Sequence, residues 1–164
     1  MVGGGRMTQS RTKGKRAELE AAKDVGQLLG VLFHRTQQFN GKGLGDIEPM
    51  NGPYTVHWEV KHYKAGLTWW VKRSEDTALL VAGELCYCRL KHLPGILRRN
   101  YLAFSSVTCG FAERWMQQAV RDAKADQVPV VVCRQDRSPW LVVWRLEDTE
   151  RMIDAVNGIA NATV

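Results

Sequence analysis

Three side chains in the first half of the chain have the types and the spacing of a metal-dependent hydrolytic site. Asp46 precedes Glu59 by thirteen residues, and Lys61 follows Glu59 by two. Two carboxylates are what a hard divalent cation such as Mg²⁺ requires, with water and phosphate oxygens completing its coordination. A cation held there makes a bound water easier to deprotonate, and a neighbouring lysine can orient that water and stabilise an anionic transition state. The pattern therefore predicts hydrolytic chemistry with Mg²⁺, or Mn²⁺ in its place, as the cofactor.

The segments around these residues predict how they come together. Residues 54–61 alternate between apolar and polar side chains, which is typical of a strand with one buried face, so Glu59 and Lys61 project from the same polar face. Asp46 follows a glycine-rich loop over 40–45, and a turn at Gly52-Pro53 allows its segment to pair with this strand. A single Glu-x-Lys pair is usually a surface ion pair, so the prediction depends on the three residues together.

The remaining hydrophobic patterns indicate an α/β domain with a central mixed sheet flanked by helices. Beyond the strand at 54–61, the predicted elements are amphipathic helices over 15–32 and 111–124, apolar strands over 128–133 and 140–144, and a short helix from about Asp148. Residues 64–110 are expected to be an insertion after the strand that carries Glu59, with short helical elements at 79–82 and 96–97. The chain thus divides into a basic flexible arm over 1–14, one domain over 15–147 and a C-terminal helix and tail over 148–164.

The distribution of charge favours a polyanionic partner. The net charge is +6 and the isoelectric point is about 9.3. Residues 1–17 contain basic side chains and no acidic one, and we expect Arg11, Lys13, Lys15 and Arg16 to bind the phosphate backbone of DNA. A solvated, disordered tail has the same composition, and the two descriptions are compatible.

The composition also excludes some classes of protein. No run of about 18 apolar residues predicts a membrane span, and the polar, basic N-terminus does not have the pattern of a secretory signal. The protein is therefore expected in the cytoplasm, with no membrane partner. The four cysteines, at positions 86, 88, 109 and 133, are expected there as reduced thiols.

The order of several short motifs resembles a known family. Asp46 followed by Glu59-Val60-Lys61 resembles the signature of the PD-(D/E)xK nuclease superfamily. Residues 13–18, which open the first helix, and residues 115–123, 128–132 and 139–143 are similar to archaeal-type Holliday junction resolvases and their phage relatives. The likeness covers about residues 13–63 and 111–147. Gly45 stands where the signature has proline, and residues 64–110 have no counterpart.

The resemblance implies a restriction-endonuclease-like fold and an Mg²⁺-dependent endodeoxyribonuclease that resolves four-way or otherwise branched DNA. It implies a homodimer, in a bacterial or phage-infected host cytoplasm, and a third metal-binding carboxylate at Glu18. Glu48 is a nearby rival to Asp46, but the spacing favours Asp46. The further positions expected to contact DNA are Arg35, Gln37, Lys64 and Gln118.

Other functions remain open. A nicking or restriction-like enzyme for ordinary duplex DNA is the nearest alternative, and a non-catalytic, basic DNA-binding protein is the second. A structural zinc at Cys86, Cys88, His92 and Cys109 is disfavoured because the Cys-x-Cys spacing differs from the usual Cys-x-x-Cys. Most tryptophans lie on apolar faces and are expected in the core, whereas Trp69-Trp70 has the composition of a stacking surface at a DNA branch point.

Overall fold

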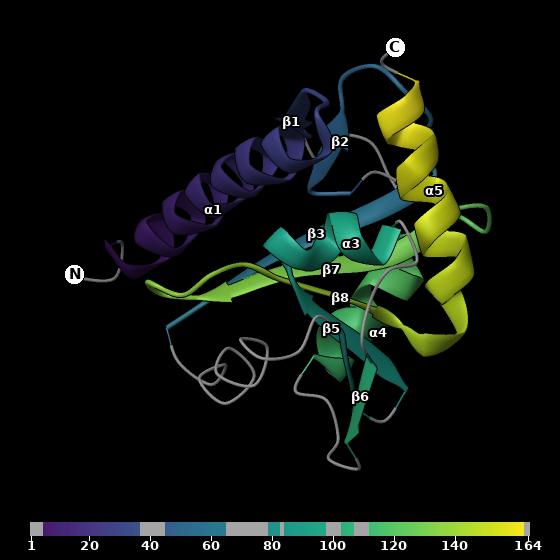
Figure 1. Cartoon of the computed structure of the whole chain (residues 1–164). Helices are drawn as coiled ribbons and strands as arrows, with labels where there is room; N and C mark the ends of the chain where they lie inside the picture. The colour runs from purple at the N-terminus through teal and green to yellow at the C-terminus, as the bar shows by residue number, and fades with distance from the viewer. Residues whose placement is uncertain are drawn as a thin grey trace.

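The computed structural model describes residues 5–36, 45–64, 79–82, 84–97, 103–106 and 112–162. Its elements, drawn in Figure 1, are α1 (Gly5–Leu29), β1 (Phe33–Arg35), β2 (Ile47–Pro49), β3 (Val56–Tyr63), β4 (Leu79–Ala82), β5 (Leu85–Arg89), the 3-10 turn η1 (Leu90–His92), α3 (Leu93–Leu97), β6 (Ala103–Ser106), α4 (Glu113–Asp122), β7 (Val128–Gln135), β8 (Leu141–Arg145), the 3-10 turn η2 (Leu146–Asp148) and α5 (Thr149–Asn161).

The strands form one mixed sheet in the order β1-β2-β3-β7-β8-β5-β4-β6. Strands β1, β2 and β3 are antiparallel neighbours, β3 runs parallel to β7 along its whole length, and β7 and β8 are antiparallel. Helices cover both faces of this sheet (Figure 1). The predicted α/β class with a central mixed sheet flanked by helices is therefore confirmed.

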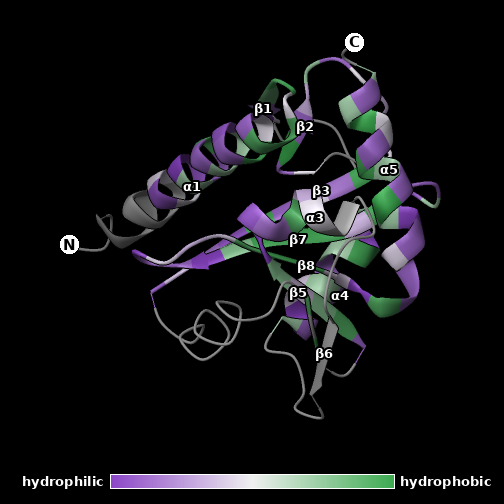
Figure 2. Cartoon of the chain, viewed as in Figure 1, coloured by the Kyte–Doolittle hydropathy of each residue, from purple (hydrophilic) through white to green (hydrophobic). Residues whose placement is uncertain are grey.

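The alternation of side chains in β3 and β7 explains the two layers of helix. Trp58 in β3, opposite Val130 in β7, packs into the larger core together with apolar residues of α1 and α5. The residues between them in the sequence, such as Val131, face the other way and pack against α4. Figure 2 shows the apolar centre of the sheet between these helices, whose outer surfaces are polar. The polar side chains of β3 consequently lie on the face that α4 covers.

The predicted insertion continues the sheet instead of forming a separate helical element. Its strands β5, β4 and β6 extend the sheet beyond β8, with β5 antiparallel to β8. The helical prediction for 79–82 is wrong, because these residues form β4. Periodicity cannot distinguish strand from helix in an apolar run of this length, and pairing with β5 decides the outcome. The helical expectation for 96–97 is confirmed by α3.

The first helix is longer toward the N-terminus than its periodicity predicts. It begins at Gly5 instead of Lys15, so residues 5–14 of the predicted arm are helical. It ends at Leu29, and Gly30 follows with a φ of +70°, the left-handed conformation that glycine commonly supplies after a helix. Among the residues that the structure describes, no helix is long and apolar enough to cross a membrane.

Candidate active site

The polar face of β3 brings Glu59 and Lys61 together beneath α4. Glu59 is buried, with 5% of its surface exposed, and its Oε1 atom lies 2.5 Å from the Nζ atom of Lys61. Gln118 of α4 completes the group, because its Nε2 donates to Oε1 of Glu59 at 2.7 Å and its Oε1 accepts from Nζ of Lys61 at 3.1 Å. The predicted Glu-x-Lys pair is thus a half-buried, fixed arrangement.

Asp46 reaches this group from the neighbouring strand. Ile47 of β2 lies opposite Trp58, so the antiparallel register places Asp46 beside Glu59. Its Oδ2 atom accepts a hydrogen bond from the backbone N–H of Val60 at 2.8 Å, and its own N–H donates to the carbonyl of Trp58 at 2.7 Å. The two bonds fix both the backbone and the carboxylate of Asp46 against β3.

Gly45 makes that close approach possible. A Cβ atom at position 45 would lie 2.7 Å from both the N and the O atom of Trp58, a separation that real Cβ atoms essentially never show. Thr36 holds the same residue from the other side, because its hydroxyl donates to the carbonyl of Gly45. Glycine at position 45 is therefore a packing requirement of this chain.

Electrostatics distinguish the two carboxylates. Burial, the nearby charge of Glu59 and, more weakly, that of Glu18 raise the pKa of Asp46 to about 6, although the Val60 N–H and Lys61 act in the opposite direction. Burial also acts to raise the pKa of Glu59, but His57 and Lys61 outweigh it and leave that pKa below its ordinary value. The site therefore holds more negative charge than its lysine neutralises, which favours a bound cation.

Glu48, the rival to Asp46, lies elsewhere on β2. It is buried, and its pKa is raised by burial against the charges of His34, Lys124 and His57. Its register partner is His34 of β1, whereas Asp46 contacts β3 directly. The geometry favours Asp46 as the partner of Glu59.

The third predicted carboxylate, Glu18 of α1, is already in an ion pair. Its Oε2 atom contacts the guanidinium of Arg35 in β1, and both side chains are mostly buried. Arg35, which the resemblance places among the DNA contacts, thus faces Glu18. Glu18 lies near enough to influence Asp46. Within the described part of the chain, however, no group of three or more His, Cys, Asp or Glu residues is arranged to hold a metal ion.

The residues fit a hard divalent cation bound by two protein carboxylates. Asp46 and Glu59 could supply oxygen ligands, and a cation would offset the burial and the charge of Glu59 that raise the pKa of Asp46. Mg²⁺ commonly binds through one or two carboxylates and keeps several waters. A third carboxylate is not required for such a site.

His57 is a neighbour of the site that the sequence reasoning did not select. It lies on the polar face of β3, is 1% exposed, and places Nε2 3.7 Å from Oε2 of Glu59. The alternation that identified Glu59 and Lys61 also includes His57, so its position on the polar face, two residues before Glu59, was the available signal.

The predicted DNA-contacting residues are distributed over three places. Lys13 pairs with Asp136 at 3.1 Å, and Arg16 pairs with Glu20. Lys15 and Lys64 are exposed. Gln118 belongs to the carboxylate site itself. The side chain of Arg11 and the whole of Gln37 lie outside the described residues.

The cysteines and tryptophans are placed as follows. Cys86 and Cys88 on β5 and Cys133 on β7 are buried free thiols, and burial raises the pKa of Cys86 to about 11. Cys109 and Trp69-Trp70 lie outside the described residues. Trp58 and Trp144 are completely buried, as expected for core residues, and Trp115 is half-buried beside Tyr63.

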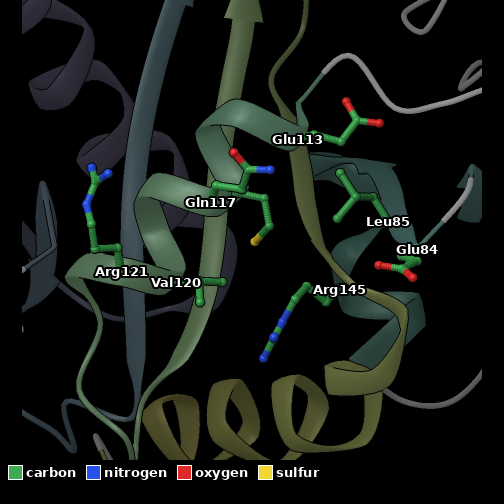
Figure 3. A pocket seen from close by; sticks show the side chains of 8 residues that line it. Glu84, Leu85, Glu113, Gln117, Val120, Arg121 and Arg145 are labelled. Atoms are coloured by element: carbon green, nitrogen blue, oxygen red, sulfur yellow. The ribbon is translucent and has the colours of Figure 1, made fainter.

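A separate groove of about 520 Å³ lies on the flank of α4 that faces away from β3. Leu85, Met116 and Val120 line it with apolar surface, and charged residues from α4, from β8 and from the turn before β5 surround them (Figure 3). Glu113 and Arg121 lie at opposite ends of this flank, each four residues from Gln117. Neither Glu59 nor Lys61 contributes to this groove.

Comparison of the chain with protein-family models, with curated proteins and with solved structures finds no significant match.

Proposed function

We propose that the protein is a metal-dependent DNA endonuclease of the PD-(D/E)xK type, and that branched DNA, such as a four-way junction, is its substrate. One observation carries the proposal. The carboxylate of Asp46 is fixed against the backbone of β3 beside Glu59, whose carboxylate contacts both Lys61 and Gln118. Two buried carboxylates and an ammonium group on one face are costly unless the site has a use for their charge.

The proposed chemistry divides among these residues. Asp46 and Glu59 would hold Mg²⁺, which when bound supplies a more acidic water and offsets charge on the phosphate. Lys61 lies against Glu59, where its ammonium group can orient the attacking water and stabilise the added negative charge of the transition state. Gln118 is a positioning residue, because it contacts Glu59 and Lys61 at once and so fixes their relative geometry.

The fold is compatible with this assignment. The elements around the candidate site are α1, the antiparallel strands β1, β2 and β3, and, after the segment that holds β4, β5 and β6, helix α4 and strand β7, which is parallel to β3. We propose that this is a restriction-endonuclease-like sheet extended by β5, β4 and β6. The preference for junctions rests on the sequence resemblance, and duplex nicking is the alternative that the substrate comparison below distinguishes.

Paired cutting of a four-way junction needs two active sites, so we propose a homodimer formed through the α4 groove. Glu113 and Arg121 are equally spaced about Gln117. A two-fold axis near Gln117 would therefore bring each glutamate opposite the arginine of the second copy. The apolar floor of the groove would supply buried area. Since Gln118 and β3 lie on the other flank of α4, such a contact would leave the carboxylates accessible.

The test is cleavage of a four-way junction and of a linear duplex of matched sequence, each with Mg²⁺ and with EDTA. The wild type is expected to cut the junction with Mg²⁺ only, and Asp46→Ala and Lys61→Gln to lose at least a hundredfold in rate. Asp126→Asn, which changes an exposed carboxylate in the α4–β7 connection, is the control and should cut normally. Equal cutting by the wild type and Asp46→Ala, or none by the wild type, would overturn the proposal. Equal rates on junction and duplex would favour the nicking or restriction-like alternative.

A further inference from the structure

A second, strongly basic pocket lies between the N-terminal half of α1 and the tip of the β7–β8 hairpin. Its volume is about 290 Å³. In Figure 1 the hairpin tip lies beside the N-terminal part of α1, and the ion pair between Lys13 and Asp136 joins the two. The lining residues, which we call the α1–hairpin pocket, are Lys13, Arg16, Ala17, Glu20, His62, Arg134, Asp136 and Arg137.

This pocket adjoins the candidate active site along two elements. On β3, His62 of the pocket directly follows Lys61 of the site. On α1, Ala17 of the pocket directly precedes Glu18, whose charge acts on Asp46. His62 and Lys61 point to opposite faces of β3, so a polyanion must cross the end of β3 to contact both.

The charges in the pocket do not balance. Four side chains are cationic, namely Lys13, Arg16, Arg134 and Arg137, and two are anionic, namely Glu20 and Asp136. Glu20 is shared by Arg16 and Arg134. Asp136 pairs with Lys13, and its Oδ1 atom also lies 2.7 Å from Nε2 of His62. In the part of the chain that the structure describes, Arg137 has no acidic partner.

The pKa of His62 responds to the charges around the pocket. Burial and the positive charges of Lys13 and Arg134 lower its pKa, although Asp136 and Glu20 act in the opposite direction. The lowered pKa disfavours the charged form of the imidazole, so His62 adds little to the positive charge of the pocket. An anion in the pocket would oppose the effect of Lys13 and Arg134.

Contacts with Trp140 and Glu20 fix the side chain of Arg134 in the pocket. Its guanidinium stacks over the ring of Trp140 at 4.4 Å from the ring centroid, and it pairs with Glu20 on one side. Its Nε atom is buried without a hydrogen-bond partner among the described residues. A fixed guanidinium loses little side-chain entropy when it binds a phosphate.

Arg137 has a positive φ, a backbone conformation that residues other than glycine rarely adopt. The N–H of Ser138 donates to the carbonyl of Gln135 at 3.0 Å, which closes a four-residue turn with Arg137 at its third position. The φ of Arg137 is +61°, and glycine or asparagine is usual at such a position. A non-glycine residue there costs on the order of 1 kcal/mol, and retained strain of this kind is a guide to function.

We propose that the α1–hairpin pocket binds a backbone phosphate of the DNA substrate, and that Lys13, Arg134 and Arg137 contact this phosphate. That the phosphate belongs to DNA rests on the proposed nuclease function; the ability of the pocket to bind phosphate does not. The pocket would hold the DNA strand at a fixed distance from Asp46 and Glu59. The pocket lies on the opposite side of β3 from α4.

Arg137→Gly is the decisive variant, because glycine suits the turn and the fold should be at least as stable as in the wild type. Binding of a fluorescent duplex and of a four-way junction is measured in EDTA, where no cleavage occurs. Arg137→Gly is expected to bind both about tenfold more weakly and to reduce the slope of log affinity against log salt by about one. Arg114→Ala removes one exposed charge from α4 and is the matched control, with an unchanged slope.

A second experiment, with inorganic phosphate in place of DNA, tests whether the pocket binds phosphate at all. In the wild-type protein, phosphate should raise the pKa of His62 measured by NMR, and in Arg137→Gly the same concentration should raise it much less. A shift by phosphate without loss of DNA affinity in Arg137→Gly would reduce the pocket to a site for free phosphate and overturn the DNA assignment. No shift by phosphate would overturn the pocket itself. Absence of Mg²⁺-dependent cleavage by the wild type, with the expected results in both binding experiments, would contradict the nuclease proposal alone.

Discussion

Replacement of Asp46 by asparagine should make the metal-free protein more stable at neutral pH. Asp46 is 8% exposed, and its pKa is raised from 3.8 to about 6, chiefly by burial and by the charge of Glu59. At 1.36 kcal/mol for each pH unit, ionisation of this one group costs the folded state about 3 kcal/mol at pH 7. Asparagine keeps an oxygen that accepts the Val60 N–H but carries no charge.

The sign of the pH dependence follows from where the proton is bound. Between pH 3.8 and about 6 the folded protein retains a proton on Asp46 that the unfolded chain has released. Stability due to this group therefore falls as the pH rises through that window, and the full cost is present above it. Asp46→Asn should equal the wild type below pH 4 and exceed it by up to about 3 kcal/mol at pH 7.5.

Urea unfolding in EDTA, followed by tryptophan fluorescence at a series of pH values, measures this difference. Asp126→Asn, at an exposed carboxylate, is the control and should follow the wild type at every pH. Mg²⁺ should reverse the order, because it stabilises only a protein that binds it. Equal stability of the wild type and Asp46→Asn at pH 7.5, or a difference that does not change with pH, would refute the reasoning.

Three further predictions concern the geometry of the site and the assembly. Gly45→Ala should destabilise the fold by about 1–3 kcal/mol, because the Cβ of the alanine would meet the backbone of Trp58. The same change should displace Asp46 and lower the cleavage rate by about a hundredfold. Normal rates would show that the close approach is not needed. Mg²⁺ affinity measured by calorimetry should rise with pH through about 6, since the cation competes with the proton on Asp46; an affinity independent of pH between 5 and 7 would separate the metal from this carboxylate. Arg121→Glu should convert a dimer to monomer in sedimentation, and the added change Glu113→Arg should restore the dimer; a double variant that stays monomeric would exclude the proposed pairing.

The local pattern of the sequence was sufficient to predict the strand that carries Glu59 and Lys61. The alternation over β3 follows from the two-residue period of a strand, so it predicted that Glu59 and Lys61 share one face. The apolar runs of β7 and β8 were equally readable, because a strand buried on both faces is continuously hydrophobic. The sequence favours Asp46 over Glu48 because Asp46 follows Gly45 and has the expected spacing from Glu59, and the register of β2 supports that choice.

Long-range pairing decided what the pattern left open. Residues 79–82 form a strand only because β5 and β6 lie on either side of them. The ion pair between Glu18 and Arg35 depends on the angle at which α1 meets β1, and no local period encodes that angle.

The α1–hairpin pocket also depends on contacts between segments that are distant in the sequence. Arg134 and Lys13 are far apart in the sequence and become neighbours only when α1 packs over β3 and β7. The residue types and their local spacing thus determined which side chains were available for the candidate site. The tertiary structure determined which of them meet, because burial and charge coupling depend on neighbours that the chain supplies from a distance.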